Sequence, residues 1–215
     1  MKPIKTLTKD EESLKEIGRA SIQIVHDLKN QLNGLKLYAT FLRKRMEKSE
    51  RPSDELETIS KLIAGLERAA GDMTTLVRLS RPIELRRQQA DLTNILSDLS
   101  EGDGISLEAE ADNLVGEYDL ATITEALKTI TASALGQRVP DNANGIHIHA
   151  RLDEHGLALI EWRGLKINDE DPFHSLAGSE GIRMSLAAKF IEAHGGQSGH
   201  DVNALWVRLP LKMQG

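Results

Sequence analysis

One histidine in the first quarter of the chain lies in a setting that suits chemistry on a helix surface. Residues 21–32 carry apolar side chains at the spacing of an amphipathic helix, and His26 falls on the side away from them. Its neighbours on that side are polar except for Ile22. A neutral imidazole is a competent nucleophile towards phosphorus, and its ordinary pKa of about 6.5 leaves most of it neutral near pH 7. The setting therefore permits phosphoryl transfer, although a surface histidine is usually just a solvated side chain.

Three neighbours of His26 could assist this chemistry. Asp27 can orient the imidazole or accept its proton. Lys29 lies one turn on and can neutralise a phosphoryl oxygen. Asn30, four residues after the histidine, can donate a hydrogen bond to the phosphoryl group or place a water that removes it. We predict His26, Asp27, Lys29 and Asn30 as the catalytic set.

Long helices must position these residues. An apolar repeat of three and four residues extends from about Leu14 to Met46, and a second follows Asp54 until Pro82. The charged, proline-containing segment between them predicts a turn, so the two helices should form an antiparallel hairpin. A seam of this length usually pairs with a second hairpin, and we expect a homodimer held by a four-helix bundle. The first seam consists of Leu14, Ile17, Ile24, Leu28, Leu35 and Leu42.

The second half of the chain changes to α+β. Periodicity predicts helices at about 91–99, 119–135 and 180–194, and strands near 105–109, 146–150, 157–162 and 204–209. The predicted fold class is thus α+β, with a long hairpin over residues 1–84 and a sandwich of helices on a mixed sheet over residues 85–215. His147 and His149 share one face of a strand, but no carboxylate partner is evident in the sequence, which favours an ordinary surface strand over a metal site.

Composition narrows the function classes. The net charge of −6 provides no dominant basic field, so we expect no nucleic-acid partner. The 215 residues include no cysteine, which rules out disulfides and thiolate chemistry. No apolar run approaches the roughly 20 residues of a membrane span, so no membrane segment is expected and the predicted location is cytoplasmic.

Residues His26-Asp-Leu-Lys-Asn-Gln-Leu32 resemble the H-box of two-component histidine kinases. In that family the histidine accepts a phosphoryl group and is followed by an acidic residue, with Thr or Asn four positions after it. The likeness extends to the hairpin, to its exit at Arg81-Pro82, and to the segment that begins at Asp91. It implies the roles of His26, Asp27 and Asn30, and it implies response-regulator receiver domains as partners.

The second half resembles the ATPase domain of the same kinases in outline, and the resemblance implies a degenerate nucleotide site. At the two asparagine positions of the N-box stand Thr129 and Ser133. The aspartate that reads adenine is replaced by Trp162, two residues before Gly164, and the Gly-x-Gly-x-Gly box keeps only Gly181. We therefore expect the chain to bind no cofactor, ATP included, with Mg²⁺ supplied by the receiver domain.

Three hypotheses follow from this combination. The first is a histidine phosphotransferase that relays a phosphoryl group between His26 and receiver aspartates without ATP. The second is a divergent sensor histidine kinase core that autophosphorylates His26. The third is a non-catalytic pseudokinase scaffold that binds receivers or a kinase. The lost nucleotide motifs count against the second hypothesis, and the intact surroundings of His26 count against the third.

Overall fold

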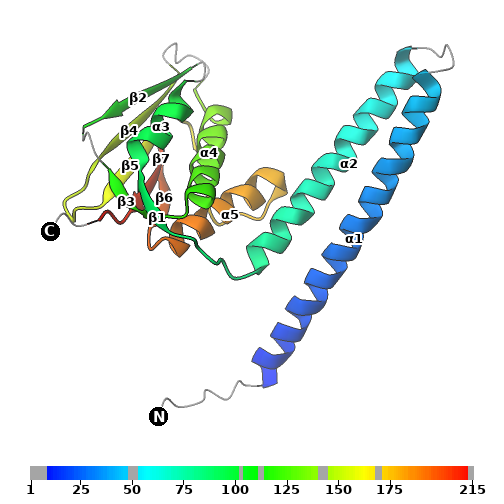
Figure 1. Cartoon of the computed structure of the whole chain (residues 1–215), viewed down its shortest axis with the longest axis horizontal. Helices are drawn as coiled ribbons and strands as arrows, with labels where there is room; N and C mark the ends of the chain where they lie inside the picture. The colour runs from blue at the N-terminus through cyan, green and yellow to red at the C-terminus, as the bar shows by residue number, and fades with distance from the viewer. Residues whose placement is uncertain are drawn as a thin grey trace. The chain divides into compact units, whose positions relative to one another are not determined.

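The computed structural model describes residues 9–47, 53–101, 104–110, 114–139, 145–167 and 171–212. Within the first helix, side chains are described at Val25 and from Leu28 onward. The chain divides into two compact units, residues 1–81 and residues 82–215. In the described parts, the first unit is helical and the second combines helices with strands (Figure 1).

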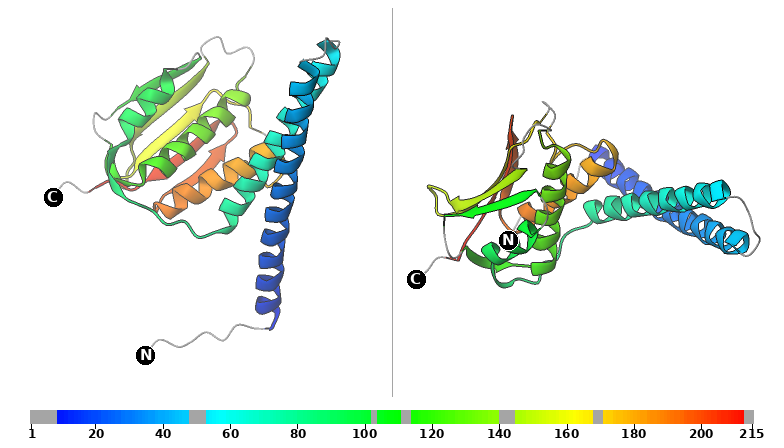
Figure 2. Two further views of the ribbon diagram at one scale, coloured as in Figure 1. Left: turned by 45° about the vertical axis from the view of Figure 1, so that its right-hand side comes forward. Right: turned by 90° about the horizontal axis from the view of Figure 1, so that it is seen from above.

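The first unit is a hairpin of two long helices, α1 (Lys9–Glu47) and α2 (Ser53–Ser80), which lie side by side in the views of Figures 1 and 2. The Lys36 ammonium lies 2.7 Å from the Glu67 carboxylate and links the two helices. No helix in the described part of the chain has the length and apolar character of a membrane span. The buried cluster between the helices consists of Ala39, Ile59 and Ile63, with Met46 and Leu66 packed against it.

The leucine seam predicted for α1 is not the surface that contacts α2. Leu28, Leu35 and Leu42 are 41%, 54% and 53% exposed, whereas Ala39 is 3% exposed. The small Ala39 side chain lies in the contact with α2, whereas the role of the leucines as the seam of a dimeric bundle stays a prediction. In the single chain the leucines therefore form an apolar stripe beside the contact with α2.

The second unit contains a mixed five-stranded sheet with the order β2-β4-β5-β7-β6. β2 pairs parallel with β4, and the other neighbours pair antiparallel. Side chains alternate between the two faces, so Ile148, Ile160 and Val207 are buried on the face that carries the core. The strands are β2 (Ile105–Ala109), β4 (Ile146–Leu152), β5 (Ala158–Arg163), β6 (Gln197–Asp201) and β7 (Ala204–Leu209).

Helices α3 (Leu92–Ser100), α4 (Leu120–Gly136) and α5 (Gly178–Ala193) cover one face of this sheet (Figures 1 and 2). Their apolar faces meet the buried strand residues, as the complete burial of Leu96, Leu127 and Ile191 shows. Burying this much Leu and Ile surface is the main stabilising contribution, at about 25 cal/mol per Å² of apolar area. The α4–α5 pair packs closely and defines the cleft described below.

Two short strands directly precede helices α3 and α4. β1 (Gln88–Asp91) pairs antiparallel with β3 (Val115–Tyr118). Asp91 then caps α3 by accepting a hydrogen bond from the Thr93 N–H at 2.9 Å. Asp119 caps α4 in the same way, accepting from the Thr122 N–H at 3.0 Å. Satisfying these N–H groups fixes where each helix begins.

His194 joins the end of α5 to the start of α4. Its Nδ1 lies 2.7 Å from the Phe190 carbonyl, and its Nε2 accepts a hydrogen bond from the Asp119 N–H at 3.0 Å. This pairing requires a neutral ring with its proton on Nδ1. The side chain is almost completely buried, and its ring tilts against Tyr118. His194 is therefore part of the framework.

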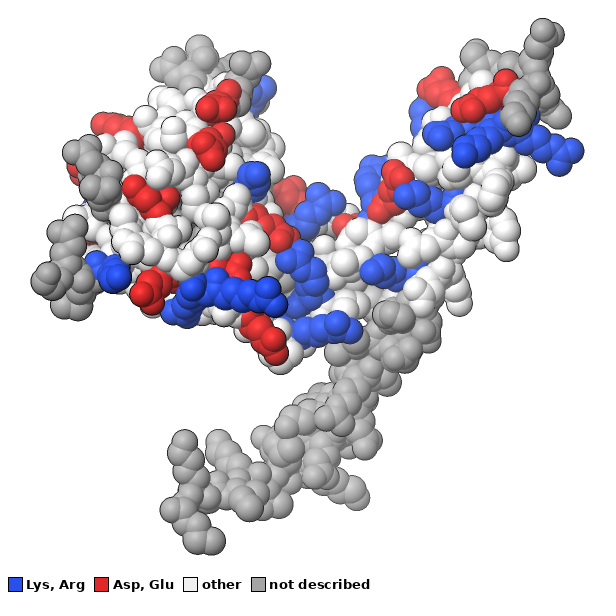
Figure 3. Space-filling view, in the orientation of Figure 1, with Lys and Arg blue, Asp and Glu red and all other residues white. Residues whose placement is uncertain are grey.

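Charged side chains of both signs are interspersed on the face drawn in Figure 3. This mixture agrees with the modest net charge of −6. The fields of neighbouring opposite charges partly cancel, and salt screens the remainder beyond a Debye length of about 8–10 Å at physiological ionic strength. Long-range attraction of a polyanion such as nucleic acid has no support on that face.

Candidate functional site

The predicted phosphoacceptor lies in the middle of α1, which continues through residue 26 without interruption. The side chains of His26 and Asp27 lie outside the described residues, so their roles stay predictions. Lys29 is half-buried and Asn30 is exposed. The helix thus presents at least one of the predicted polar side chains to solvent.

Two exposed apolar side chains continue along the helix from position 26. Leu37 and Phe41 are 55% and 60% exposed. They follow position 26 by 11 and 15 residues, about three and four turns, so these positions share one side of the helix. The sequence pattern did not single them out, because they lie outside the apolar repeat. Their signal was present, as large apolar residues at positions outside the predicted core.

In the second unit, two cavities open between α4 and α5. We call the first the Gln137 cavity; it has a volume of about 300 Å³ and its lining includes Gln137, Ile167, Asp171 and Met184. The second, which we call the Lys128 cavity, has a volume of about 400 Å³ and its lining includes Lys128, Thr129 and Arg183. Ser133 and Glu180 line both cavities. Volumes of this size suit small-molecule ligands.

A hydrogen-bonded chain joins three of the residues that line the cavities. Gln137 Nε2 donates to Ser133 Oγ at 2.9 Å, and Ser133 Oγ donates to Glu180 Oε1 at 2.6 Å. Ser133 is 5% exposed, so its hydroxyl is held in one orientation. Bonds from a hydroxyl to a carboxylate are short and strong. Glu180 is consequently tied to α4 from the first turn of α5. Gln137, which sequence analysis missed, shares a helix face with Ser133 at a spacing of four residues.

Burial and hydrogen bonding fix the charge of Asp171 in the Gln137 cavity. Burial acts to raise the pKa of this carboxyl, but hydrogen bonds from the His174 ring and the Phe173 N–H outweigh it and hold the pKa below its ordinary value. The His174 Nδ1 lies 2.7 Å from Asp171 Oδ2. Asp171 is therefore a carboxylate at neutral pH.

Trp162 fills the space between β5 and α4. Its side chain is completely buried, and its Nε1 donates to Thr131 Oγ1 at 2.9 Å. Thr131 in turn donates to the Leu127 carbonyl at 2.8 Å. The indole N–H is thus satisfied by protein, as a buried tryptophan requires. Trp162 lines neither of the two cavities.

The two retained glycines have structural reasons to be glycine. A Cβ at Gly181 would lie 2.7 Å from the Ser175 carbonyl oxygen, so this close approach excludes any side chain. Gly164 has a φ of 88°, a region that favours glycine, at the point where β5 ends. Thr129 Oγ1 donates to the Glu125 carbonyl at 2.9 Å within α4. None of these three positions needs a bound ligand to explain it.

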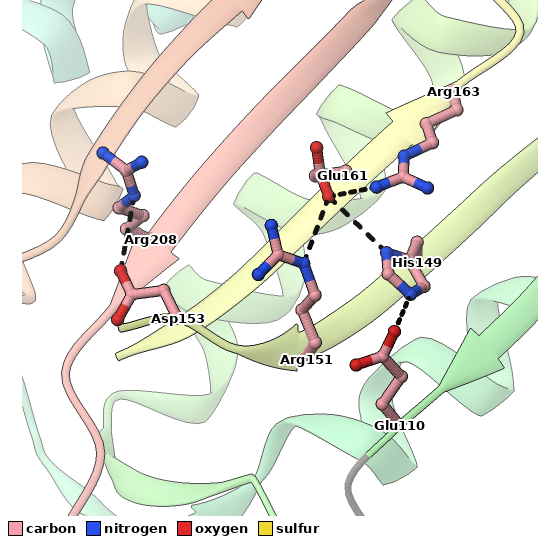
Figure 4. A network of polar contacts seen from close by, with 7 residues as sticks. All are labelled: Glu110, His149, Arg151, Asp153, Glu161, Arg163 and Arg208. Atoms are coloured by element: carbon pink, nitrogen blue, oxygen red, sulfur yellow. Dashed lines mark hydrogen bonds and ion pairs between the residues drawn. The ribbon is translucent and has the colours of Figure 1, made fainter. Parts of the chain in front are cut away.

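The other face of the sheet carries a polar network, seen in Figure 4. His149 is buried, with Nε2 2.8 Å from Glu110 Oε1 and Nδ1 3.5 Å from Glu161 Oε2. Glu161 also pairs with Arg163 at 2.6 Å and with Arg151 at 3.6 Å. The interpretation of His149 as an ordinary surface residue with no evident carboxylate partner was wrong, because Glu161 in the adjacent β5 and Glu110 directly after β2 both reach its ring. Among the described residues, no cluster of three or more His, Asp or Glu is placed to hold a metal.

Comparisons with known proteins identify solved structures of a similar fold. No family model matches the chain, and no curated protein matches it. Solved structures do match: full-length ShkA in complex with AMPPNP has 16% identity and a TM-score of 0.68, covering 87% of this chain and 44% of that chain. The Acinetobacter baumannii histidine kinase AdeS has 15% identity and a TM-score of 0.55, covering 87% of this chain and 98% of that chain.

The chain has a histidine kinase-like fold. At identities of 15% and 16% the likeness concerns the fold alone. The chain spans less than half of the length of ShkA. The fold class predicted from the sequence is confirmed as α+β with a mixed sheet and helices of this type. The dimeric bundle and the catalytic set stay predictions.

Proposed function

We propose that this chain is a two-component phosphotransferase in which His26 relays a phosphoryl group between receiver-domain aspartates without ATP. One observation carries the ATP-independent part. Trp162 stands where the resembled kinases have the adenine-reading aspartate, and its indole is buried and hydrogen-bonded to Thr131. A carboxylate that could accept a hydrogen bond from an adenine amino group is therefore replaced by a satisfied apolar ring. This replacement supports the proposal that the chain works without ATP.

The hairpin supports the relay part of the proposal. Along the side of α1 that contains position 26, the exposed Leu37 and Phe41 form an apolar surface on which a receiver domain could dock. The leucine stripe of Leu28, Leu35 and Leu42 lies on a different side and suits a second copy of the hairpin. A homodimeric four-helix bundle would bury the stripe and leave the surface near His26 open.

The proposed chemistry requires little beyond positioning. An imidazole nitrogen of His26 forms a bond to phosphorus while the bond from phosphorus to the receiver's aspartyl oxygen breaks, and the carboxylate leaves with the electron pair. The other ring nitrogen then loses its proton to Asp27 or to water. Transfer to a second receiver reverses these steps. Mg²⁺ for both steps would come from the receiver's acidic pocket.

A second candidate is a histidine kinase core that phosphorylates His26 from ATP, and the fold comparisons favour it. AdeS is described as a histidine kinase and is matched over 98% of its chain. ShkA, the other match, is in complex with AMPPNP. The two candidates share the phosphoacceptor and differ in the donor. The choice between them is therefore an experiment on donors.

The deciding experiment offers the chain both donors. Receiver domains from the same genome, phosphorylated with radiolabelled phosphate, are mixed one by one with the purified chain, and labelled ATP with Mg²⁺ is tested in parallel. We expect label to move from at least one receiver to the chain and none from ATP. The label should be lost in acid and retained in base, as expected for phosphohistidine. His26→Gln should abolish it.

Each other outcome selects a different function. Labelling from ATP, or calorimetry that shows micromolar affinity for Mg-ATP, would support the kinase core and contradict the phosphotransferase. Exchange with no receiver would leave the scaffold hypothesis, in which the chain binds receivers or a kinase without chemistry. Label that persists in His26→Gln would place the phosphoacceptor elsewhere.

A further inference from the structure

Three residues line both cavities of the cleft between α4 and α5: Ser133, Met184 and Glu180. Glu180 lines both the Gln137 cavity and the Lys128 cavity, and its bond to Ser133 spans the cleft between them. The two cavities adjoin at these shared residues and have volumes of about 300 and 400 Å³. The Glu180 carboxylate therefore occupies a place that a ligand could otherwise fill.

The charges around Glu180 suit an anion at that place. Of the described residues that line the Lys128 cavity, Lys128 and Arg183 are cationic, and Glu180 is the single carboxylate. Glu180 also lies in the first turn of α5, where the helix dipole favours negative charge. The residue before the helix, Ala177, provides no side-chain cap. Both features stabilise an anion, and the chain itself supplies it.

The carboxylate is fixed rather than free. Ser133 is buried and receives a hydrogen bond from Gln137, which aims its own hydroxyl hydrogen at Glu180. The 2.6 Å bond fastens α5 to α4 in the way that a bound anion contacting both helices would. Removing the carboxylate would leave Lys128 and Arg183 in a cavity with no carboxylate among its described lining residues.

We propose that Glu180 is a built-in anionic ligand of the α4–α5 cleft, which both fastens the two helices and excludes polyphosphates from the Lys128 cavity. The inference rests on the proposed function only in taking the native cleft to hold no ATP. Glu180 is thus a specificity-determining residue. Its removal should convert the cleft into a polyphosphate site.

The test compares four full-length proteins: the native chain, Glu180→Ala, Glu180→Gln, and Glu192→Gln as control. Glu192 is an exposed carboxylate in the last turns of α5, so its variant loses the same charge away from the cleft. The probe is inorganic tripolyphosphate without metal. Its binding is measured by titration calorimetry and by thermal melting. We expect affinity at least about tenfold higher for both Glu180 variants than for the native chain and Glu192→Gln, with a gain that falls as salt rises.

A melting curve separates a folding failure from a failed inference. Glu180→Gln keeps an acceptor for Ser133 and should retain the native transition, whereas Glu180→Ala should melt earlier and recover with tripolyphosphate. Equal tripolyphosphate affinity for all four folded proteins would overturn the inference. Mg-ATP binding by the native chain would instead contradict the proposed function, so the two failures are distinguishable.

The fastening role has its own measurement. Ser133→Ala and Glu180→Ala each remove one end of the bond, and the double variant removes both. If the bond ties the helices, the loss in melting temperature of the double variant should be clearly smaller than the sum of the single losses. Strictly additive losses would show that the two side chains act independently and would contradict this part of the inference.

Discussion

At the scale of single residues, positions of the second unit that correspond to nucleotide-binding residues in the resembled kinases are occupied by side chains that stabilise the fold. Trp162 and Gly181 illustrate this. The tryptophan is completely buried and bonded to Thr131, and the glycine is required by the nearby Ser175 carbonyl. Retention of a motif residue is therefore no sign of retained binding, because packing alone explains Gly181.

Trp162→Phe should destabilise the fold by about 1–3 kcal/mol, since it removes the bond to Thr131 and leaves a small void. Urea unfolding followed by circular dichroism would measure the loss. The matched control is Trp206→Phe, because Trp206 is half-buried on the other sheet face beside Arg208. A loss for Trp162→Phe no larger than the control's would show that its hydrogen bond contributes little.

His194 makes stability depend on pH. Burial lowers the pKa of its ring below the ordinary value, Arg87 adds to this, and the Phe190 carbonyl and Asp119 oppose it. The unfolded chain therefore binds the proton first as pH falls below about 6.5. Above that pH, the neutral His194 ring should make its full contribution to the free energy of unfolding. This contribution should be lost as the pH falls towards the pKa of His194 in the folded protein, by at most about 1.4 kcal/mol per pH unit.

The measurement is the free energy of unfolding between pH 7.5 and 5, for the native chain and for His194→Gln. The variant should be less stable at pH 7.5 and should show a flatter pH dependence. His155→Gln serves as control, because that side chain is exposed. An unchanged slope in His194→Gln would assign the pH dependence to other groups.

At the scale of elements, periodicity predicted the long helices and the apolar strands, because burial imposes a repeat on them. It missed β1, β3 and β6, which are short and rich in polar residues or glycine. In β6, Gly199 suggests a turn in the sequence, yet a Cβ there would collide with the Trp206 ring from the neighbouring strand. The reason for that glycine lies in a partner strand, which sequence alone does not reveal.

The candidate site was predictable to a similar degree. The position of His26 on a long helix followed from local spacing, whereas the bond between Ser133 and Glu180 joins residues 47 positions apart. The partners of His149 were hidden for the same reason. Contacts between distant segments depend on how the helices and strands pack together. A single sequence carries little information about that packing.

The leucine stripe of α1 leads to a prediction about assembly. Leu35→Glu places a charge in the centre of the stripe, so it should convert a dimer into a monomer, with the dissociation constant raised at least about 100-fold. Sedimentation equilibrium would measure this. Lys44→Glu is the control, since Lys44 is exposed near the same end of the helix. A native chain that is monomeric at high concentration would contradict the proposed bundle.

At the scale of the whole molecule, the two units differ in the core that their described residues form. The described side chains of the hairpin bury mainly Ala39, Ile59 and Ile63, whereas the α+β unit buries side chains from all three of its helices and from its sheet. A hairpin of two helices has one internal interface and is marginal alone. Its stability should come from a second copy, and that of the α+β unit from its own chain.

Calorimetry should therefore show two transitions. The one that belongs to the hairpin should move to higher temperature as protein concentration rises, because dimer formation stabilises the folded state by mass action. The transition of the α+β unit should keep its temperature over the same range. A single transition that is independent of concentration would contradict both the proposed dimer and the separate stability of the units.

The tie between Ser133 and Glu180 has a consequence for the cell. A ligand that diffuses acts only when its concentration is high enough, whereas a side chain tethered to the same polypeptide is present at a fixed effective concentration. The proposed role of Glu180 in the cleft would therefore fasten the two helices to the same extent at any ATP concentration. On that proposal, the state of this domain would not depend on the energy charge of the cell.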